Sequence, residues 1–364
     1  MRASSFRYVA CVGLVLLALP NLVLADVLNM PSGLASLELV AVDNPGNSGE
    51  LSGAGVGGYG PDRVCGAVGY AYRMGRFEVT AGQYCEFLNA VAAADTYGLY
   101  NPVMALTDPP GYADNSCRIL RSGTPGSYTY SVAADWANRP VNYVSWGDAA
   151  RFANWLTNGQ LTGAQGPSTT EDGSYYLNGA VTNEALLGVT RKPNARYVIP
   201  TEDEWYKAAY HKNDGATGNY WVYTTATDTL PSNVLGDPTD PGNNATFLCT
   251  DPYTLTIGGP YYRTEVGAHE HSESPYGTFD QGGNVYEWNE TLIGDSYPLS
   301  HRGLRGGSYI DLADYSLPAT CRSGGEPTLE GKAFGFRIAE VPEPASLWLL
   351  ALAAFGLAQW RRGS

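Results

Sequence analysis

The stretch 274–288 holds the side chains best suited to bind a cation. Asp280, Asn284 and Glu287 offer hard oxygen atoms, and Gly283, with the glycine before it, favours a tight turn with positive φ. Calcium takes about six to eight oxygen ligands, and backbone carbonyls exposed by such a turn can supply some of them. The stretch therefore indicates a calcium site, with an ion-free, polar hairpin as the alternative.

No other group of residues completes a catalytic or metal site. His269 and His271 would share one face of a strand, but nothing nearby completes a ligand set, so a polar exposed turn explains them better. The chain has no P-loop, dinucleotide fingerprint or nucleophile elbow. Glu202 and Glu204 fit the first turn of a helix better than a glycosidase pair of carboxylates.

Three helices and several short strands must position these groups. Capping boxes and apolar residues at helical spacing predict helices at 80–94, 145–156 and 201–209. The polar, Gly-rich stretch 159–195 is expected to be an insertion. Alternating residues predict short strands at 37–42, 70–79, 196–200, 285–288, 304–309 and 335–339. No linker divides the body, so we expect one α+β domain with little regular secondary structure.

The composition excludes some classes of partner. The chain has 364 residues, a net charge of −14 and only 16% charged residues. Because an acidic surface repels phosphate backbones, we expect no nucleic-acid partner. The excess acid suits a secreted protein that tolerates calcium.

The two ends of the chain carry targeting signals. Residues 1–25 combine early arginines, an apolar run and small residues at a cleavage site, which predicts a secretory signal peptide. Residues 341–364 begin Val-Pro-Glu-Pro, continue with a short apolar segment and end near an arginine pair. This tail resembles the PEP-CTERM sorting signal. The resemblance implies an exported, extracellular or surface protein of a Gram-negative, exopolysaccharide-producing bacterium. It also implies an exosortase partner and transient attachment through a short transmembrane segment. A plain C-terminal membrane anchor is the alternative.

Five cysteines remain after the signal peptide is removed. An oxidising compartment permits up to two disulfides among them and leaves one thiol over. The sequence does not determine the pairing, although Cys85, in a helical segment, is the best candidate for a buried free thiol. The five are Cys65, Cys85, Cys117, Cys249 and Cys321.

The order of several short motifs resembles the formylglycine-generating enzyme family, also called sulfatase-modifying factor domains. The matching segments lie between residues 66 and 340, and their order is more specific than any one of them. The resemblance implies a C-type-lectin-like α+β fold for a single domain, 26–340. The segments are Arg76-Phe-Glu-Val-Thr80, Arg139-Pro-Val-Asn-Tyr-Val-Ser-Trp146, Pro200-Thr-Glu-Asp-Glu-Trp205, Gly283-Asn-Val-Tyr-Glu-Trp288, Arg305-Gly-Gly-Ser308 and Gly335-Phe-Arg337.

The resemblance also implies structural calcium sites. One would use the side chains of Asp280 and Glu287 with the carbonyls of Gly283 and Val285. A second, whose loop lengths differ from the family pattern, is best matched by Asn244, Ala245, Asp251 and Tyr253.

The chain departs from the family at the catalytic cysteines. Catalytic members carry two cysteines five residues apart that bind Cu(I), which requires soft thiolate ligands. The corresponding positions here are Asp311 and Ser316, and Cys321 stands alone. We therefore expect no copper and no formylglycine-generating activity. The His-rich domain through which bacterial sulfoxide-forming relatives bind iron is absent as well.

Two functions are consistent with a sequence that lacks the catalytic cysteine pair. The first is a non-catalytic, calcium-stabilised binding or scaffold module outside the cell, associated with exopolysaccharide or another surface protein. The alternative is an enzyme with different chemistry in the same cleft, lined by Ser308, Asp311 and Ser316. Arg305 and Arg337 are interpreted as partners in buried ion pairs, with a role in binding a ligand carboxylate as the alternative.

Overall fold

The computed structural model describes residues 28–53, 55, 58–106, 116–236, 242–294 and 300–342. The predicted signal peptide and nearly all of the predicted sorting tail lie outside these ranges. Within them, no helix is both long enough and apolar enough to cross a membrane. The assignment of a transmembrane segment is therefore withdrawn.

Six short α-helices and one 3₁₀ helix occur in the described ranges. The three predicted helices are confirmed, and each begins with a two-sided capping box in which the cap side chain and the third helical residue bond each other's backbone N–H. The helices are α1 (Ala81–Val91), η1 (Pro102–Ala105), α2 (Ala134–Ala137), α3 (Trp146–Thr157), α4 (Asn183–Leu187), α5 (Glu202–Tyr210) and α6 (Ala313–Ser316).

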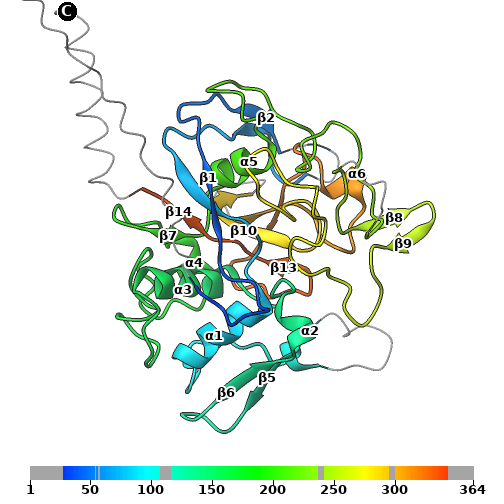
Figure 1. Ribbon diagram of the computed structural model, residues 1–364. Helices are drawn as coiled ribbons and strands as arrows, with labels where there is room; N and C mark the ends of the chain where they lie inside the picture. Colours follow the sequence, from blue (N-terminus) through cyan, green and yellow to red (C-terminus); the bar gives the residue numbers. More distant parts are fainter. Residues whose placement is uncertain are drawn as a thin grey trace, which may run out of the picture.

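Two four-stranded sheets form the framework. The first has the order β1-β4-β14-β7, made of Leu39–Val42, Tyr72–Gly75, Ala339–Glu340 and Tyr197–Val198, all antiparallel. The second has the order β12-β11-β10-β13, made of Ser323–Gly325, His301–Arg305, Tyr286–Ile293 and Phe334–Gly335, with β10 and β13 parallel. β10 lies in the middle of the molecule, with α5 above it and α1 below it in the view of Figure 1.

Three two-stranded ribbons complete the strands. They are β2 with β3 (Glu50–Ser52, Arg63–Cys65), β5 with β6 (Ile119–Ser122, Thr129–Val132) and β8 with β9 (Leu248–Thr250, Tyr253–Leu255). The β8–β9 ribbon lies beside α6 at one side of the molecule (Figure 1).

The main core is built from aromatic rings. The ring of Phe152 on α3 lies 5.3 Å from that of Phe87 on α1, 5.4 Å from Phe336 and 5.6 Å from Trp155. Edge-to-face and tilted pairs of this kind stabilise a core beyond the area they bury. The buried α1 positions are those that the helical spacing predicts, including Tyr84.

Two details differ from the sequence predictions. The predicted strand 304–309 ends at Arg305, because Gly306 and Gly307 take φ values of +95° and +72°, which turn the chain away from the sheet. The five cysteines are all free thiols, and four of them, including Cys85, are buried.

Candidate functional site

The predicted calcium stretch forms a tight turn that leads into β10. Asp280, Gly283 and Asn284 have φ values of +59°, +88° and +58°. At Gly283, a Cβ atom would lie 2.2 Å from the carbonyl oxygen of Thr246, so only glycine fits. The turn delivers Glu287 to a position between Arg305 on β11 and Gly335 on β13.

Arg337 holds the Glu287 carboxylate, and both side chains are fully buried. Its Nε lies 2.5 Å from Oε2 and its Nη2 lies 2.6 Å from Oε1, while the indole N–H of Trp205 donates to Oε2 at 2.7 Å. Both carboxylate oxygens of Glu287 thus already accept charged or indole hydrogen bonds. The interpretation of Arg337 as a buried ion-pair partner is confirmed.

Asp280 lies on the same side of Arg337. Its Oδ2 accepts a hydrogen bond of 2.6 Å from the backbone N–H of Gly267. Burial, and to a smaller extent the charge of Glu287, raises the pKa of Asp280 to about 6, although the Gly267 N–H and Arg337 act in the opposite direction.

Glu78 is a residue that the sequence analysis overlooked. Its side chain is buried, and neither carboxylate oxygen has a hydrogen-bond partner among the described residues. Burial and then the charge of Asp280 raise the pKa of Glu78 well above its usual range, and Arg337 offsets only part of this. Buried carboxylate oxygens without partners are costly, and a proton or a cation relieves that cost.

Glu78, Asp280 and Glu287, the carboxylate cluster, lie near Arg337, but in the described structure they do not group closely enough to form a metal site, so they match a hard cation in donor chemistry alone. Asp280 and Glu78 supply oxygens that the protein leaves wholly or partly unused, and oxygen is the donor that calcium prefers. Glu287 offers less, because Arg337 and Trp205 occupy its oxygens. The signal for Glu78 was present in the segment Arg76-Phe-Glu-Val-Thr80, but its burial depends on distant chain segments.

The second predicted set of calcium ligands is not brought together. Asn244 is buried and its backbone bonds Ser272, whereas Asp251 occupies the tip of the β8–β9 ribbon beside Tyr253, which is 76% exposed. The chain from Asn244 to Asp251 is extended, so about 20 Å separates its ends at roughly 3.3 Å per residue. Ala245 lies at the Asn244 end, where its carbonyl accepts a bond from Thr256.

The histidines do not form a shared site. His269 is buried with its Nε2 3.0 Å from the hydroxyl of Thr246, while His271 is exposed. Over the described ranges, no three His, Cys, Asp or Glu side chains group closely enough to hold a metal ion.

Asp311 lies between β11 and α6, and Ser316 is the last residue of α6. The hydroxyl of Ser308 donates a short hydrogen bond to the Asp311 carboxylate, and the backbone N–H of Leu248 donates to the Asp311 carbonyl at 3.0 Å. Burial raises the pKa of Asp311, with Ser308 acting against it. Tyr286 bonds Ser316 and lies near Asp311. The structure thus brings Ser308 into contact with Asp311, and Tyr286 links Ser316 to the same region.

Cys321 does not add a reactive thiolate to this region. It is buried, and its burial raises the pKa of the thiol to about 11. A thiol with this pKa stays protonated at neutral pH and is a poor nucleophile and metal ligand.

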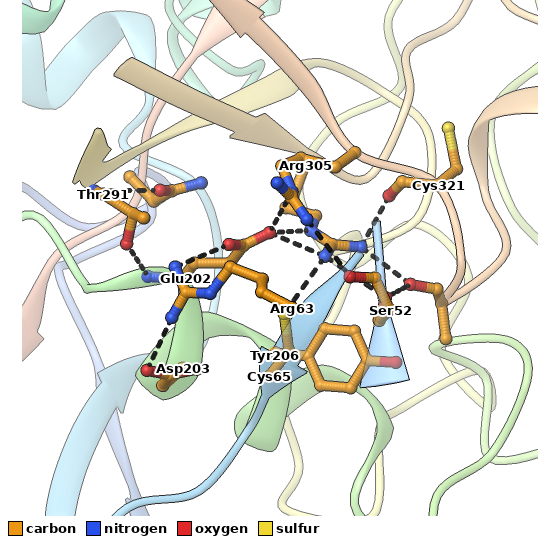
Figure 2. Close-up of polar contacts among 12 residues, drawn as sticks. Ser52, Arg63, Cys65, Glu202, Asp203, Tyr206, Thr291, Arg305 and Cys321 are labelled. Atoms are coloured by element: carbon orange, nitrogen blue, oxygen red, sulfur yellow. Dashed lines mark hydrogen bonds and ion pairs between the residues drawn. The ribbon is translucent and has the colours of Figure 1, made fainter. Parts of the chain in front are cut away.

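Arg305 belongs to a separate buried network centred on Glu202 (Figure 2). Its guanidinium lies 2.6 Å from Glu202 Oε1, Arg322 lies 2.9 Å from the same oxygen, and Arg63 lies 3.0 Å from Oε2. Burial raises the pKa of Glu202, but Arg305, Arg322 and Arg63 outweigh it, and the net effect is a lowered pKa. Glu204 is paired with Arg191 at 2.7 Å, so the two glutamates are structural helix acids and Arg305 is a structural ion-pair partner.

Comparison with solved structures supports the fold. The chain is similar to Treponema denticola variable protein 1, with a TM-score of 0.51 at 19% identity, covering 85% of this chain and 96% of that one. CarF matches with a TM-score of 0.43 at 21% identity over 84% of this chain and 99% of that chain. PvdO from Pseudomonas aeruginosa matches with a TM-score of 0.48 at 18% identity, over 84% of this chain and 95% of that chain. Comparison with curated proteins gave no match.

Two family models match the sequence. The PEP-CTERM protein-sorting motif matches residues 340–362, which implies exosortase processing and export to the surface or exterior of a Gram-negative cell. The model described as "Sulfatase-modifying factor enzyme 1-like domain" matches residues 64–341. The predicted α+β fold of the formylglycine-generating enzymes is confirmed. With most of its length matched, this chain belongs to the sulfatase-modifying factor enzyme 1-like family.

Proposed function

We propose that the protein is an exported, non-catalytic binding or scaffold module of its family. The observation that carries the proposal is the side-chain chemistry beside α6, where Ser308 and Asp311 form a hydrogen-bonded pair and Ser316 lies near them. By the resemblance to catalytic members of the family, Asp311 and Ser316 stand where those members carry the two copper-binding cysteines. Hydroxyl and carboxylate groups are hard ligands that do not replace a pair of thiolates for Cu(I).

The module is stabilised by calcium in the carboxylate cluster. The ligands would be the side chains of Asp280 and Glu287 and the carbonyls of Gly283 and Val285, with Glu78 as a further source of oxygen. Three carboxylates face one guanidinium in this cluster, so a divalent cation would balance charge that Arg337 leaves unmatched.

The proposed partner outside the cell is exopolysaccharide, with another surface protein as the other possibility. The match to the sorting motif, which implies export to the cell surface or exterior, supports this choice of partner. The negative net charge of the chain disfavours strongly acidic partners.

Metal content and catalytic activity test this proposal together. Purified protein is analysed by mass spectrometry for bound metals, melted in calcium and in chelator, and incubated with a cysteine-containing sulfatase peptide, copper and oxygen. Bound calcium, a melt lowered by chelator and an unchanged peptide are expected. Formylglycine formation or stoichiometric copper would refute the non-catalytic assignment.

A second candidate function is an enzyme with chemistry unlike that of the founding family. The observation that favours it is the convergence of Ser308, Asp311, Ser316 and Tyr286 in one region. Asp311 has a raised pKa and an adjacent hydroxyl, as a general base requires. A hydrolase screen with ester and glycoside substrates, repeated with Asp311→Asn, distinguishes the two functions, because only an enzyme loses turnover in the variant.

A further inference from the structure

The polar stretch 171–192, part of the predicted insertion, contains all of the residues that line an open groove. The groove has a volume of about 670 Å³, within the range of small-molecule sites. Its lining includes Tyr176, Asn178, Glu184 on α4, Thr190 and Lys192. It is distant from α6 and from the β8–β9 ribbon, which lie on the opposite side of the molecule in Figure 1.

A buried ion pair holds the loop of this groove in shape. Arg151 on α3 contacts Glu171 through two bonds of 2.7 and 3.1 Å, and it also donates to the carbonyl of Ala180 at 2.9 Å. Glu171 in turn accepts a bond of 2.7 Å from the N–H of Gly179. Because all of these groups are tied to the core helix α3, the loop between them is rigid before any ligand arrives.

Two adjacent tyrosines of the loop have opposite environments. Tyr175 is fully buried, packs edge-on against Trp146 and is held by both backbone bonds to Asn154. Tyr176 is 61% exposed, and no other ring packs on it within the described residues. Tyr175 therefore anchors the loop, and Tyr176 lines the groove with its ring largely open to solvent.

We infer that this groove binds a neutral oligosaccharide. An exposed tyrosine ring offers the flat apolar face on which the C–H side of a pyranose stacks. The amide of Asn178, the hydroxyl of Thr190 and the carboxylate of Glu184 provide the mixture of donors and acceptors that sugar hydroxyls need.

The charges of the groove disfavour acidic sugars. Lys192 is paired with Asp172 at 2.6 Å, which offsets part of its charge, whereas Glu184 is exposed. A uronate would meet this carboxylate and the negative field of the whole chain. The inference rests on the proposed function, since it names the site and the ligand class through which the module would hold exopolysaccharide.

Binding of defined oligosaccharides to the exported protein tests the inference. Hexamers of β-1,4-glucose, of mannose and of xylose are titrated calorimetrically, with hexagalacturonate as the acidic comparison. We expect at least one neutral hexamer to bind and Tyr176→Ala to weaken it by about tenfold or more. Tyr176→Trp should retain the affinity. The control is Tyr315→Ala, which removes another exposed ring (48% exposed) on the far side of the molecule and should change nothing.

Several outcomes would overturn the inference. It is wrong if no neutral hexamer binds, if hexagalacturonate binds more tightly, or if Tyr315→Ala weakens binding as much as Tyr176→Ala. Retention on a crude exopolysaccharide column separates this failure from failure of the proposed function. Wild-type retention that survives in Tyr176→Ala refutes the groove alone, whereas no retention of wild type refutes the exopolysaccharide partner.

Discussion

Arg337 binds Glu287 through two parallel hydrogen bonds of 2.5 and 2.6 Å, and neither side chain is exposed to solvent. Removing one member of such a pair leaves an uncompensated buried charge, which destabilises a protein by about 3–5 kcal/mol. We expect Arg337→Met to lower the free energy of unfolding by this amount in urea denaturation. The matched control is Arg196→Met, which breaks the half-exposed Arg196–Glu340 pair and should change stability by about 1 kcal/mol or less. Equal losses of unfolding free energy in the two variants would contradict this difference between the buried and the half-exposed ion pair.

Glu78→Gln should affect the ion-free and calcium-bound protein in opposite ways. In chelator, the neutral amide removes a buried carboxylate that lacks a partner, so the melting temperature should rise by a few degrees. In calcium, the variant replaces a charged carboxylate ligand with a neutral amide oxygen, so the stabilisation by calcium should shrink. The measurement is a thermal melt in both conditions. Equal destabilisation in both conditions would show that Glu78 has no part in binding the ion.

Calcium binding should strengthen as the pH rises from 5 to 7. The pKa of Asp280 is raised to about 6 in the folded protein, so its contribution to ion-free stability is fully present below its ordinary pKa of about 4 and is lost as the pH rises through 6. Calcium requires the ionised form and competes with the proton. The calcium-induced rise in melting temperature, measured at each pH, should follow this titration. Asp280→Asn should flatten the profile, and a wild-type profile without pH dependence would contradict the assignment.

The double variant Asp311→Cys, Ser316→Cys tests whether these positions match the family's copper site. If the alignment is right, two thiolates placed there should bind about one equivalent of Cu(I), which prefers soft ligands. Wild type and Asp311→Cys alone should bind substantially less in a competition titration with a chromogenic chelator. A double variant that binds no more copper than wild type would show that the two side chains do not face a common point.

Glu202→Gln should destabilise the protein strongly. The Glu202 carboxylate contacts three guanidinium groups, and its loss leaves them without this shared counter-charge (Figure 2). We expect a loss of about 3 kcal/mol or more, compared with about 0.5 kcal/mol or less for Glu86→Gln on the exposed face of α1. Since the folded pKa of Glu202 is lowered, its stabilisation is present above the ordinary pKa and is lost as the pH falls through the folded value. As the pH is lowered, the free energies of unfolding of wild type and variant should therefore converge.

Local signals in the sequence were sufficient to predict helices α1, α3 and α5. The capping boxes at Thr80, Ser145 and Thr201 each begin a helix, because the cap and its partner lie three residues apart and depend on no distant contact. The strand predicted at 304–309 shows what the alternation of residues does not predict. An alternation rule does not reveal that Gly306 and Gly307 adopt positive φ.

The candidate site was harder to predict, because its electrostatics depend on long-range contacts. Glu287 and Asp280 are recognisable from their spacing, but the partner of Glu287 lies fifty positions away at Arg337. Glu78 lies about two hundred residues before Asp280 and shows nothing unusual in the sequence. Asn244 and Asp251 show the reverse case. They are close in sequence, but an extended chain holds them apart.

The position of β14 has a consequence for how the protein matures. This strand pairs with both β4 and β7, and Val341 directly after it is buried, so the first sheet has a gap until residues 339–341 are in place. The sorting motif begins at residue 340, so it overlaps the last strand. The first sheet is therefore complete only when Glu340, the first residue of the matched motif, is paired with β4 and β7. Cleavage beyond β14 would remove the sorting signal and leave the sheet of the folded domain intact.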